Sequence, residues 1–420
     1  MRAGNFQRNQ GGGRMPAIIE FPAVVQEALE QFGELFANEP ERQHFGEYLT
    51  GLLVAERKTV CGINREFAQT TDQSCLNRWL TEVGWDAQAL NQKRLEYLQQ
   101  QCATRYAAQG VIAVDNTLVD HDGQHIEEVG WFWDHAQQRH KIAHDVLIAQ
   151  YVCPSARHYP LEFRRFVKRA QCEAEGREFR DHTRLFQELV DWVVEQAIPG
   201  DFTFDCYFTS AENLNHLQAV GRAYVGDLKF NRNVVSGGRV HKASDWAAQI
   251  PPQDRQRVDV GERVQWYFSK QVRLPVVDHP VRLVMLWDRK TATEPVKMLI
   301  TNRLGWEVTR VVRVYRRRWT GTELFHRDGK QHLGMADCQL RRGEGQTRHL
   351  YLVFVAYSLL MARMAQGRAR DWASALVTTI GEACRSALSE TLARTIRWVV
   401  ERAREDGWTH ERITAHLALT

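Results

Sequence analysis

Three acidic residues stand out because their surroundings are unusual for a carboxylate. Asp115 in VIAVDNT and Asp205 in FTFDCYF lie among apolar residues, and Glu323 lies in YRRRWTGTELFHRDGKQ, where most charged residues are basic. Burying an ionised carboxylate is costly unless a cation or hydrogen bonds compensate it. Carboxylate oxygens can hold Mg²⁺ while leaving positions open for phosphate and water. Each aspartate alone could be a satisfied structural residue; together with Glu323 they are oxygen ligands of the kind that holds Mg²⁺.

Positive charge is concentrated around Glu323. Between Arg310 and His349 there are ten Lys and Arg residues against four Asp and Glu residues, whereas the whole chain carries a net charge of only +4. A helix that is basic only for solubility usually pairs its bases with several acids at helical spacing. We therefore expect an anionic partner to dock beside Glu323.

The composition is that of a globular protein with a large core. The chain has 420 residues, of which 44% are hydrophobic, enough for two or three packed units. Its eight cysteines are widely spaced without a C-x-x-C pair, which favours neither a disulfide framework nor a zinc ribbon. We expect a cytoplasmic protein with no membrane segment. The longest apolar run, LYLVFVAYSLLMA from Leu350, is too short to span a bilayer and predicts a buried helix.

The N-terminal part reads as a flexible tail followed by helices. Residues 1–14 have almost nothing to bury, and residues 15–105 show helical spacing without strand patterns. Within them, GINREFAQTTDQSCLNRWLTEVGWD predicts a helix-turn-helix whose second helix begins between Thr71 and Ser74. In that case residues 15–105 form a DNA-binding domain in which Arg65, Arg78 and Lys58 meet phosphates. The alternative is an ordinary helical hairpin.

The remaining chain predicts an α/β fold. Residues 106–230 alternate strands such as GVIAVDNTLV, EEVGWFWDHA, HDVLIAQYVC and AYVGDLKF with helical stretches. Residues 231–312 contain further β-type runs, RVQWYFSKQV, VRLVMLWDR and VKMLITN, and read as a β-rich insertion. Residues 313–365 would return to the core with the helix carrying Glu323, and residues 366–420 predict a helical C-terminal region.

Asp115, Asp205 and Glu323, in this order, resemble the DDE triad of bacterial insertion-sequence transposases with a ribonuclease-H-like core. The stretch around Glu323 resembles the Y-x-x-R…E…K signature of the IS-four class, and VGWFWDHAQQRHKIAHD is similar to its IS-seven-oh-one-like branch. The similarity extends from about Phe45 to Leu360. It implies a ribonuclease-H-like mixed sheet flanked by helices and interrupted by a β-rich insertion, with the three acids as catalytic and metal-binding residues.

The signature is carried over residue by residue, with one departure. Tyr315, Arg318, Glu323 and Lys330 match it, but four residues separate Arg318 from Glu323 where three are usual. Five helical positions turn by about 140°, which would carry Arg318 off the Glu323 face. We expect either a bulge at Gly321 or replacement of Arg318 by Arg316.

Further DNA contacts are expected on two segments. Lys330 and the arginines would clamp the DNA backbone, and Tyr315 and Trp319 would stack on bases, with core packing as the alternative for Trp319. The segment LKFNRN would line the DNA channel; the alternative there is a solvated strand end. Its candidate residues are Lys229, Asn231 and Arg232.

The resemblance implies a transposase that cleaves transposon ends and joins the freed 3′-hydroxyl to target DNA with two Mg²⁺ ions, for which Mn²⁺ would substitute. It would act as a homodimer on transposon-end and target DNA in the bacterial nucleoid. The amphipathic helix 388–404 would make the subunit contact or pack on its own core. Two alternatives are a metal nuclease of the same fold without strand transfer, and an inactive relative that only binds DNA.

Overall fold

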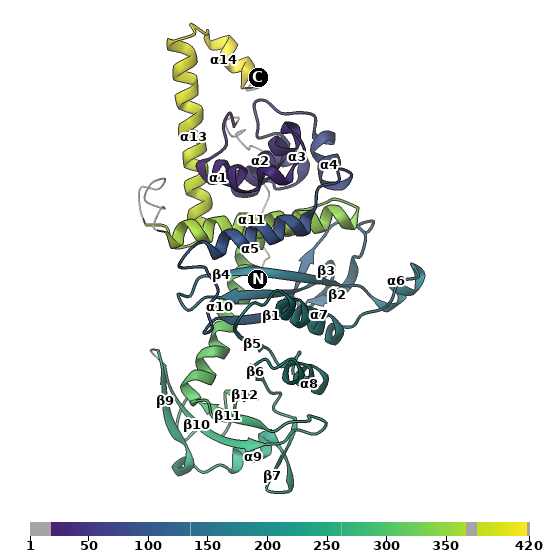
Figure 1. The fold of residues 1–420 in the computed structure, drawn as a ribbon, viewed down its shortest axis with the longest axis vertical. Coiled ribbons are helices and arrows are strands. Elements are labelled where there is room, and N and C mark those ends of the chain that lie inside the picture. The colour runs from purple at the N-terminus through teal and green to yellow at the C-terminus, as the bar shows by residue number, and fades with distance from the viewer. Residues whose placement is uncertain (1–17, 135, 262, 367–375, 418–420) are drawn as a thin grey trace, which may run out of the picture.

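The computed structural model describes residues 18–134, 136–261, 263–366 and 376–417. The predicted tail, residues 1–14, lies outside them. A large mixed sheet occupies the middle of the molecule, with the N-terminal helices at one end of the long axis and strands β9–β11 at the other (Figure 1).

The N-terminal unit is helical, as predicted. It consists of α1 (Ala23–Phe32), a 3₁₀ turn (Gly33–Leu35), α2 (Glu39–Val54), α3 (Val60–Asn64), α4 (Gln73–Thr81) and α5 (Ala87–Gln99). Helix α4 begins where the second helix of the helix-turn-helix was predicted, because the Asp72 side chain caps it by accepting from the Ser74 N–H at 2.7 Å. Stacked Trp79 and Trp85 pack with Phe36 in the core of this unit.

The central sheet has ten strands among the described residues. Along the main path their order is β2 (Gly130–Asp134), β3 (Arg139–Val152), β1 (Val111–Asp120), β5 (Asp201–Phe204), β6 (Tyr224–Asp227), β12 (Lys297–Thr301), β11 (Val281–Trp287), β10 (Arg263–Val272) and β9 (Gln256–Val260), and β4 (His158–Phe166) pairs with β3. Strands β1, β5 and β6 run parallel, whereas the other pairs are antiparallel. The predicted α/β class with a mixed sheet flanked by helices is confirmed.

The β-rich segment continues this sheet instead of forming a sheet of its own. Strand β12 pairs with β6, with Ile300 opposite Gly226, and β11, β10 and β9 follow outward. A small hairpin of β7 (Asn233–Ser236) and β8 (Arg239–Lys242), helix α9 (Ala243–Gln249) and a 3₁₀ turn (Pro252–Asp254) precede β9. The segment is therefore an extension of the central sheet.

Helices cover both faces of the sheet. Helices α6 (Arg169–Ala174), α7 (His182–Glu195) and α8 (Ala211–Ala219) belong to the first part of the core. Helix α10 (Val308–His332) packs on β1, β3 and β5, and α11 (Gly343–Ala365) lies between the N-terminal helices and β4. Helix α11 is almost entirely buried, as its apolar run predicted. No described helix is long and apolar enough to cross a membrane.

The C-terminal region contains α13 (Ile380–Arg404) and α14 (His410–His416). The first half of α13 is buried against α2, α10 and α11. Its second half extends along the N-terminal helices (Figure 1) and exposes Ile396 and Val400, which lie one turn apart.

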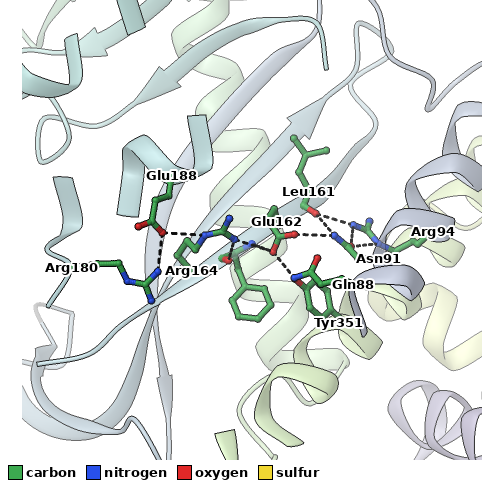
Figure 2. A network of polar contacts seen from close by, with 10 residues as sticks. Gln88, Asn91, Arg94, Leu161, Glu162, Arg164, Arg180, Glu188 and Tyr351 are labelled. Carbon is green, nitrogen blue, oxygen red and sulfur yellow. Dashed lines mark hydrogen bonds and ion pairs between the residues drawn. The ribbon is translucent and has the colours of Figure 1, made fainter. Parts of the chain in front are cut away.

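A polar network joins the N-terminal helices to the sheet (Figure 2). On α5, the fully buried Arg94 donates to Asn91 Oδ1 at 2.6 Å, and Asn91 Nδ2 donates to Leu161 O and to Glu162 Oε2 on β4. Tyr351 on α11 donates to Glu162 Oε1 at 2.6 Å. Because these buried groups satisfy one another, α5, α11 and β4 are held as one body.

Candidate active site

The sheet register brings Asp115 and Asp205 together. Strands β1 and β5 are parallel, with Val114 opposite Phe204, so the two aspartates occupy the next position on neighbouring strands. Adjacent strands lie about 4.8 Å apart, so Asp115, within β1, and Asp205, just after the end of β5, lie side by side. Both aspartates are half-buried.

Asp115 is bound by two side chains of α10. Arg318 Nη1 lies 2.5 Å from Asp115 Oδ2, and Thr322 Oγ1, one turn further along the helix, lies 3.4 Å from the same oxygen. Burial raises the pKa of Asp115 to about 7; Arg318 opposes this rise, and the negative charges of Asp205 and Glu323 add to it. The three acids are thus close enough to repel one another, and Arg318 partly neutralises them.

Gly321 has a packing role and does not form the expected bulge. Helix α10 is unbroken from Val308 to His332. A Cβ at Gly321 would lie 2.8 Å from Val152 Cγ2 and 3.1 Å from Ala113 Cβ. The glycine therefore allows α10 to approach β1 and β3 closely.

The alternative that Arg316 replaces Arg318 is also wrong. Arg316 donates to Val260 O and, at 3.1 Å, to Gln265 Oε1 on the β9–β10 hairpin, away from Asp115. Arg318 reaches the acidic residues because its partner is Asp115 on β1. Its angular offset from Glu323 on the helix therefore does not prevent it from contacting Asp115.

Glu323 and Lys330 lie on the C-terminal half of α10, and both are half-buried. Burial lowers the pKa of Lys330, while Asp120, Asp134 and Glu323 oppose this effect and Lys141 adds to it. Lys330 is therefore part of a mixed group of charges next to Glu323.

The turn after β5 holds Asp205 without a cation. Its Oδ1 accepts from the Tyr207 N–H at 2.9 Å, and in the described part of the chain no lysine or arginine pairs with it. The Tyr207 hydroxyl lies 3.1 Å from His182 Nδ1 on α7, and His182 Nε2 lies 2.8 Å from Asp145 Oδ2. Asp145 Oδ1 accepts from Asn116 Nδ2 at 2.8 Å. This chain of hydrogen bonds connects the Asp205 turn to the residue after Asp115.

The sequence did not predict this series of hydrogen bonds, because the four residues that form it come from four separate segments. It also did not single out Asp227, which follows Gly226 on β6, opposite Phe204 of β5. Asp227 differs from Asp205 because Lys297 Nζ lies 2.9 Å from its Oδ2 and the Tyr315 hydroxyl lies 3.4 Å from the same oxygen. The signal was present, since YVGD, like VIAVD and FTFD, is a short and mainly apolar run that leads to an aspartate.

The remaining predicted DNA contacts are spread over several surfaces. Trp319 is 62% exposed, so core packing does not explain it. Asn231 and Arg232 line a cavity of about 480 Å³ beside the start of α8, and Lys229 is exposed near Cys206. Arg65 and Arg78 are exposed in the N-terminal unit.

Lys58 is not available for DNA. Its side chain is buried, and Nζ donates to Ala55 O at 2.6 Å. The contact of Lys58 with phosphate that the sequence suggested is therefore wrong, because the ammonium already has a partner inside the fold.

The acidic residues of the site have the type of donor atom, carboxylate oxygen, that binds a hard divalent cation. Asp115 and Asp205 provide carboxylate oxygens on neighbouring strands, with a third carboxylate on α10. In the arrangement described, however, no three His, Cys, Asp or Glu side chains among the described residues come close enough to hold one ion. Arg318 takes the position beside Asp115 that a cation would otherwise occupy. Metal binding would therefore require Arg318 to move and Glu323 to approach.

Asp115 and Asp205 thus lie side by side on the parallel part of the sheet of an α/β fold, and the basic helix α10 packs on strands β1 and β5. Comparison with protein families matches residues 31–274 to the family described as DDE superfamily endonuclease. The match covers more than half of the chain, and the protein belongs to this family. The matched range contains Asp115 and Asp205 and ends before Glu323. Comparison with curated proteins found no match.

The family assignment implies a nuclease that acts on DNA, and the superfamily generally uses divalent metal ions. All eight cysteines are free. Their spacing in the sequence did not favour a disulfide framework.

Proposed function

We propose that the protein is a DDE transposase that cleaves phosphodiester bonds at the ends of a mobile DNA element and joins the freed 3′-hydroxyl to target DNA. The observation that carries the proposal is the placement of Asp115 and Asp205 side by side where the pairing of β1 with β5 stops, with α10 supplying Glu323 and Arg318. The family assignment supports the hydrolytic part.

In this proposal Asp115, Asp205 and Glu323 hold two Mg²⁺ ions, and Mn²⁺ substitutes for them. When bound, the ions supply activation of water and neutralisation of charge at the phosphate. Arg318, which pairs with Asp115, would also be placed to bind a phosphate oxygen of the DNA. The hydrogen-bonded residues Asn116, Asp145, His182 and Tyr207 hold the two aspartate-bearing segments in place.

The DNA-binding roles follow from exposure and charge. Lys330 and Arg318 would contact phosphates near the cleaved bond, and the exposed Trp319 would stack on a base. Tyr315 is half-buried with its hydroxyl on Asp227, so we assign it to positioning that carboxylate. The exposed Arg65 and Arg78 would contact DNA through the N-terminal unit.

A homodimer is part of the proposal, because two transposon ends must be paired. The exposed Ile396 and Val400 on the second half of α13 form an apolar pair that a second copy of the chain would cover. Replacing both with glutamine should shift a DNA-bound dimer to monomer in analytical ultracentrifugation, while the buried first half of α13 keeps the fold.

The test uses the DNA ends that flank the gene. With Mg²⁺, the wild-type protein should cut a labelled end duplex, and Asp115→Asn should abolish cutting while keeping DNA affinity within about twofold. Asp122→Asn, in an exposed turn, is the matched control and should cut normally. Unchanged cutting by Asp115→Asn would refute the catalytic assignment.

The second candidate, a nuclease without strand transfer, is favoured by the description of the matched family as an endonuclease. Pre-cleaved ends incubated with a target plasmid separate the two functions. A transposase gives joined products, whereas a nuclease gives none.

A further inference from the structure

A second basic site lies away from Asp115, between β4, α6 and α7. A cavity of about 280 Å³ opens there, lined by four arginines, Arg165, Arg177, Arg180 and Arg184, together with Glu178 and Glu188. We propose that this cavity binds a phosphate of the DNA backbone outside the cleaved bond. The inference rests on the proposed function only in taking DNA as the ligand.

Guanidinium groups outnumber the carboxylates that hold them. Glu188 is shared by Arg180 at 3.1 Å, Arg164 at 3.5 Å and Arg184 at 3.6 Å, and Figure 2 shows Arg164 and Arg180 converging on it. One carboxylate cannot saturate the donors of three guanidinium groups, each of which carries five N–H bonds. Donors are therefore left over for a further anion.

Glu128 is shared in the same way by two of the arginines that line the cavity. It lies 2.8 Å from Arg165 Nε and 2.7 Å from Arg177 Nη1. Glu175 also pairs with Arg177, at 2.6 Å. Even so, residues 164–184 contain seven Lys and Arg residues against four Asp and Glu residues. The local charge is thus positive, as a polyanion requires.

Arg165 provides the second observation. Its Nη2 donates to Thr347 Oγ1 at 2.7 Å and to Gly343 O at 3.0 Å, which fixes the guanidinium plane. Its Nη1 is enclosed and has no hydrogen-bond partner among the described residues. A buried donor without a partner is uncommon and costs roughly 1–3 kcal/mol. Arg165 is thus a fixed positive charge in the wall of the cavity.

The cavity is open enough for a long ligand. It lies on the side of the sheet where the turn after Asp205 is found. The side chains of Arg177, Arg180 and Arg184 are 39%, 46% and 61% exposed. Helix α7 begins at His182, which contacts Tyr207 in the turn after Asp205. Neighbouring residues of a strand point to opposite faces: Asp115 meets α10, while Asn116 leads through Asp145 to α7. A duplex lying across the strand ends could therefore contact both faces.

The experiment measures DNA affinity in EDTA, so it does not depend on cleavage. A labelled end duplex is titrated with the full-length protein by fluorescence anisotropy at several salt concentrations. Arg180→Gln/Arg184→Gln should weaken binding and lower the slope of log Kd against log salt by about 1–2, since each lost phosphate contact contributes about 0.9. Glu188→Gln, which removes a competing carboxylate, should bind more tightly.

The control is Arg42→Gln/Arg257→Gln, which removes the same charge from exposed arginines outside the cavity. Its slope should stay closer to that of the wild type. An unchanged slope for Arg180→Gln/Arg184→Gln, or equal losses in both double variants, would overturn the site while leaving the proposed function intact. A wild-type protein that binds no DNA would overturn both. Calorimetry measures the binding of inorganic phosphate. If the protein binds inorganic phosphate more tightly than it binds the duplex phosphates, the cavity takes a free anion and the DNA assignment is overturned.

Discussion

Replacing Gly321 with alanine should destabilise the protein, although alanine is the better helix former. In an open helix the change would contribute about 1 kcal/mol of stability. Here the new methyl would lie 2.8 Å from Val152 Cγ2 and 3.1 Å from Ala113 Cβ. Ala113 has no side-chain torsion that could relieve the contact, and Val152 is fully buried. Overpacking of this kind costs about 1–3 kcal/mol, so α10 must lift from the sheet, and after the gain in helix propensity we expect a net loss of up to about 2 kcal/mol.

The same helix offers a matched control. A Cβ at Gly329 would meet Met335 Sδ at 3.2 Å, the end of a flexible side chain. Gly329→Ala should therefore be neutral or stabilising by up to about 1 kcal/mol. Free energies of unfolding are obtained from urea titrations followed by far-UV circular dichroism and tryptophan fluorescence, whose coincidence tests for a single transition.

A third variant tests the cause. If the contact with Val152 is responsible, Val152→Ala should make room, and Val152→Ala/Gly321→Ala should lose less stability than the two single changes added together, by at least about 0.5 kcal/mol. Strict additivity, or a Gly321→Ala protein as stable as Gly329→Ala, would refute the close-packing argument. Because α10 carries Arg318 and Glu323, Gly321→Ala should also lower DNA cleavage more than its stability loss explains.

Three further predictions follow from buried charges. The raised pKa of Asp115, about 7, means that this group costs stability as the pH rises from its unfolded value of about 4. Arg318→Met should raise the pKa of Asp115 further. The free energy of unfolding of this variant should therefore keep falling by about 1.4 kcal/mol per pH unit above pH 7 in EDTA, whereas that of the wild type levels off; parallel profiles would argue against this. Burial also raises the pKa of Glu162, so urea titrations should show Glu162→Gln gaining on the wild type as pH rises from about 4 to 7; a constant difference would contradict it. His182→Ala should cost about 1–3 kcal/mol in urea unfolding and impair cleavage, whereas His216→Ala, which breaks the 2.7 Å contact with Asp191, should lose stability alone; equal cleavage by both would remove the positioning role.

The strands that lead to the acidic residues were predictable because they are buried and mainly apolar, as VIAV and FTF show. Strand β5 ends just before Asp205, but β1 continues past Asp115 to Asp120, so a strand end at Asp115 could not be inferred from the apolar run. Strand β4 was missed, because Pro160 interrupts its pattern. Proline is tolerated there because β4 lies at the edge of the sheet, next to an irregularity in its pairing with β3.

Side-chain partners were harder to predict than elements. Helical geometry alone suggested that Arg318 would miss the site, yet Arg318 binds Asp115, more than 200 residues earlier in the chain. Likewise, nothing in the local sequence of His182 indicates that it bridges Tyr207 and Asp145. Such contacts depend on the register between distant segments, which periodicity does not encode.

The shared sheet constrains how this protein can be re-engineered or can diverge. Residues 231–312 cannot be exchanged as an independent unit, because β12 pairs through its main chain with Val225, Gly226 and Asp227 of β6. A chimera cut at the predicted boundaries would expose an unpaired strand edge beside Asp227 and invite aggregation. A graft that respects the fold has to include β6 with β9–β12, and with it Asp227, the aspartate at the end of β6.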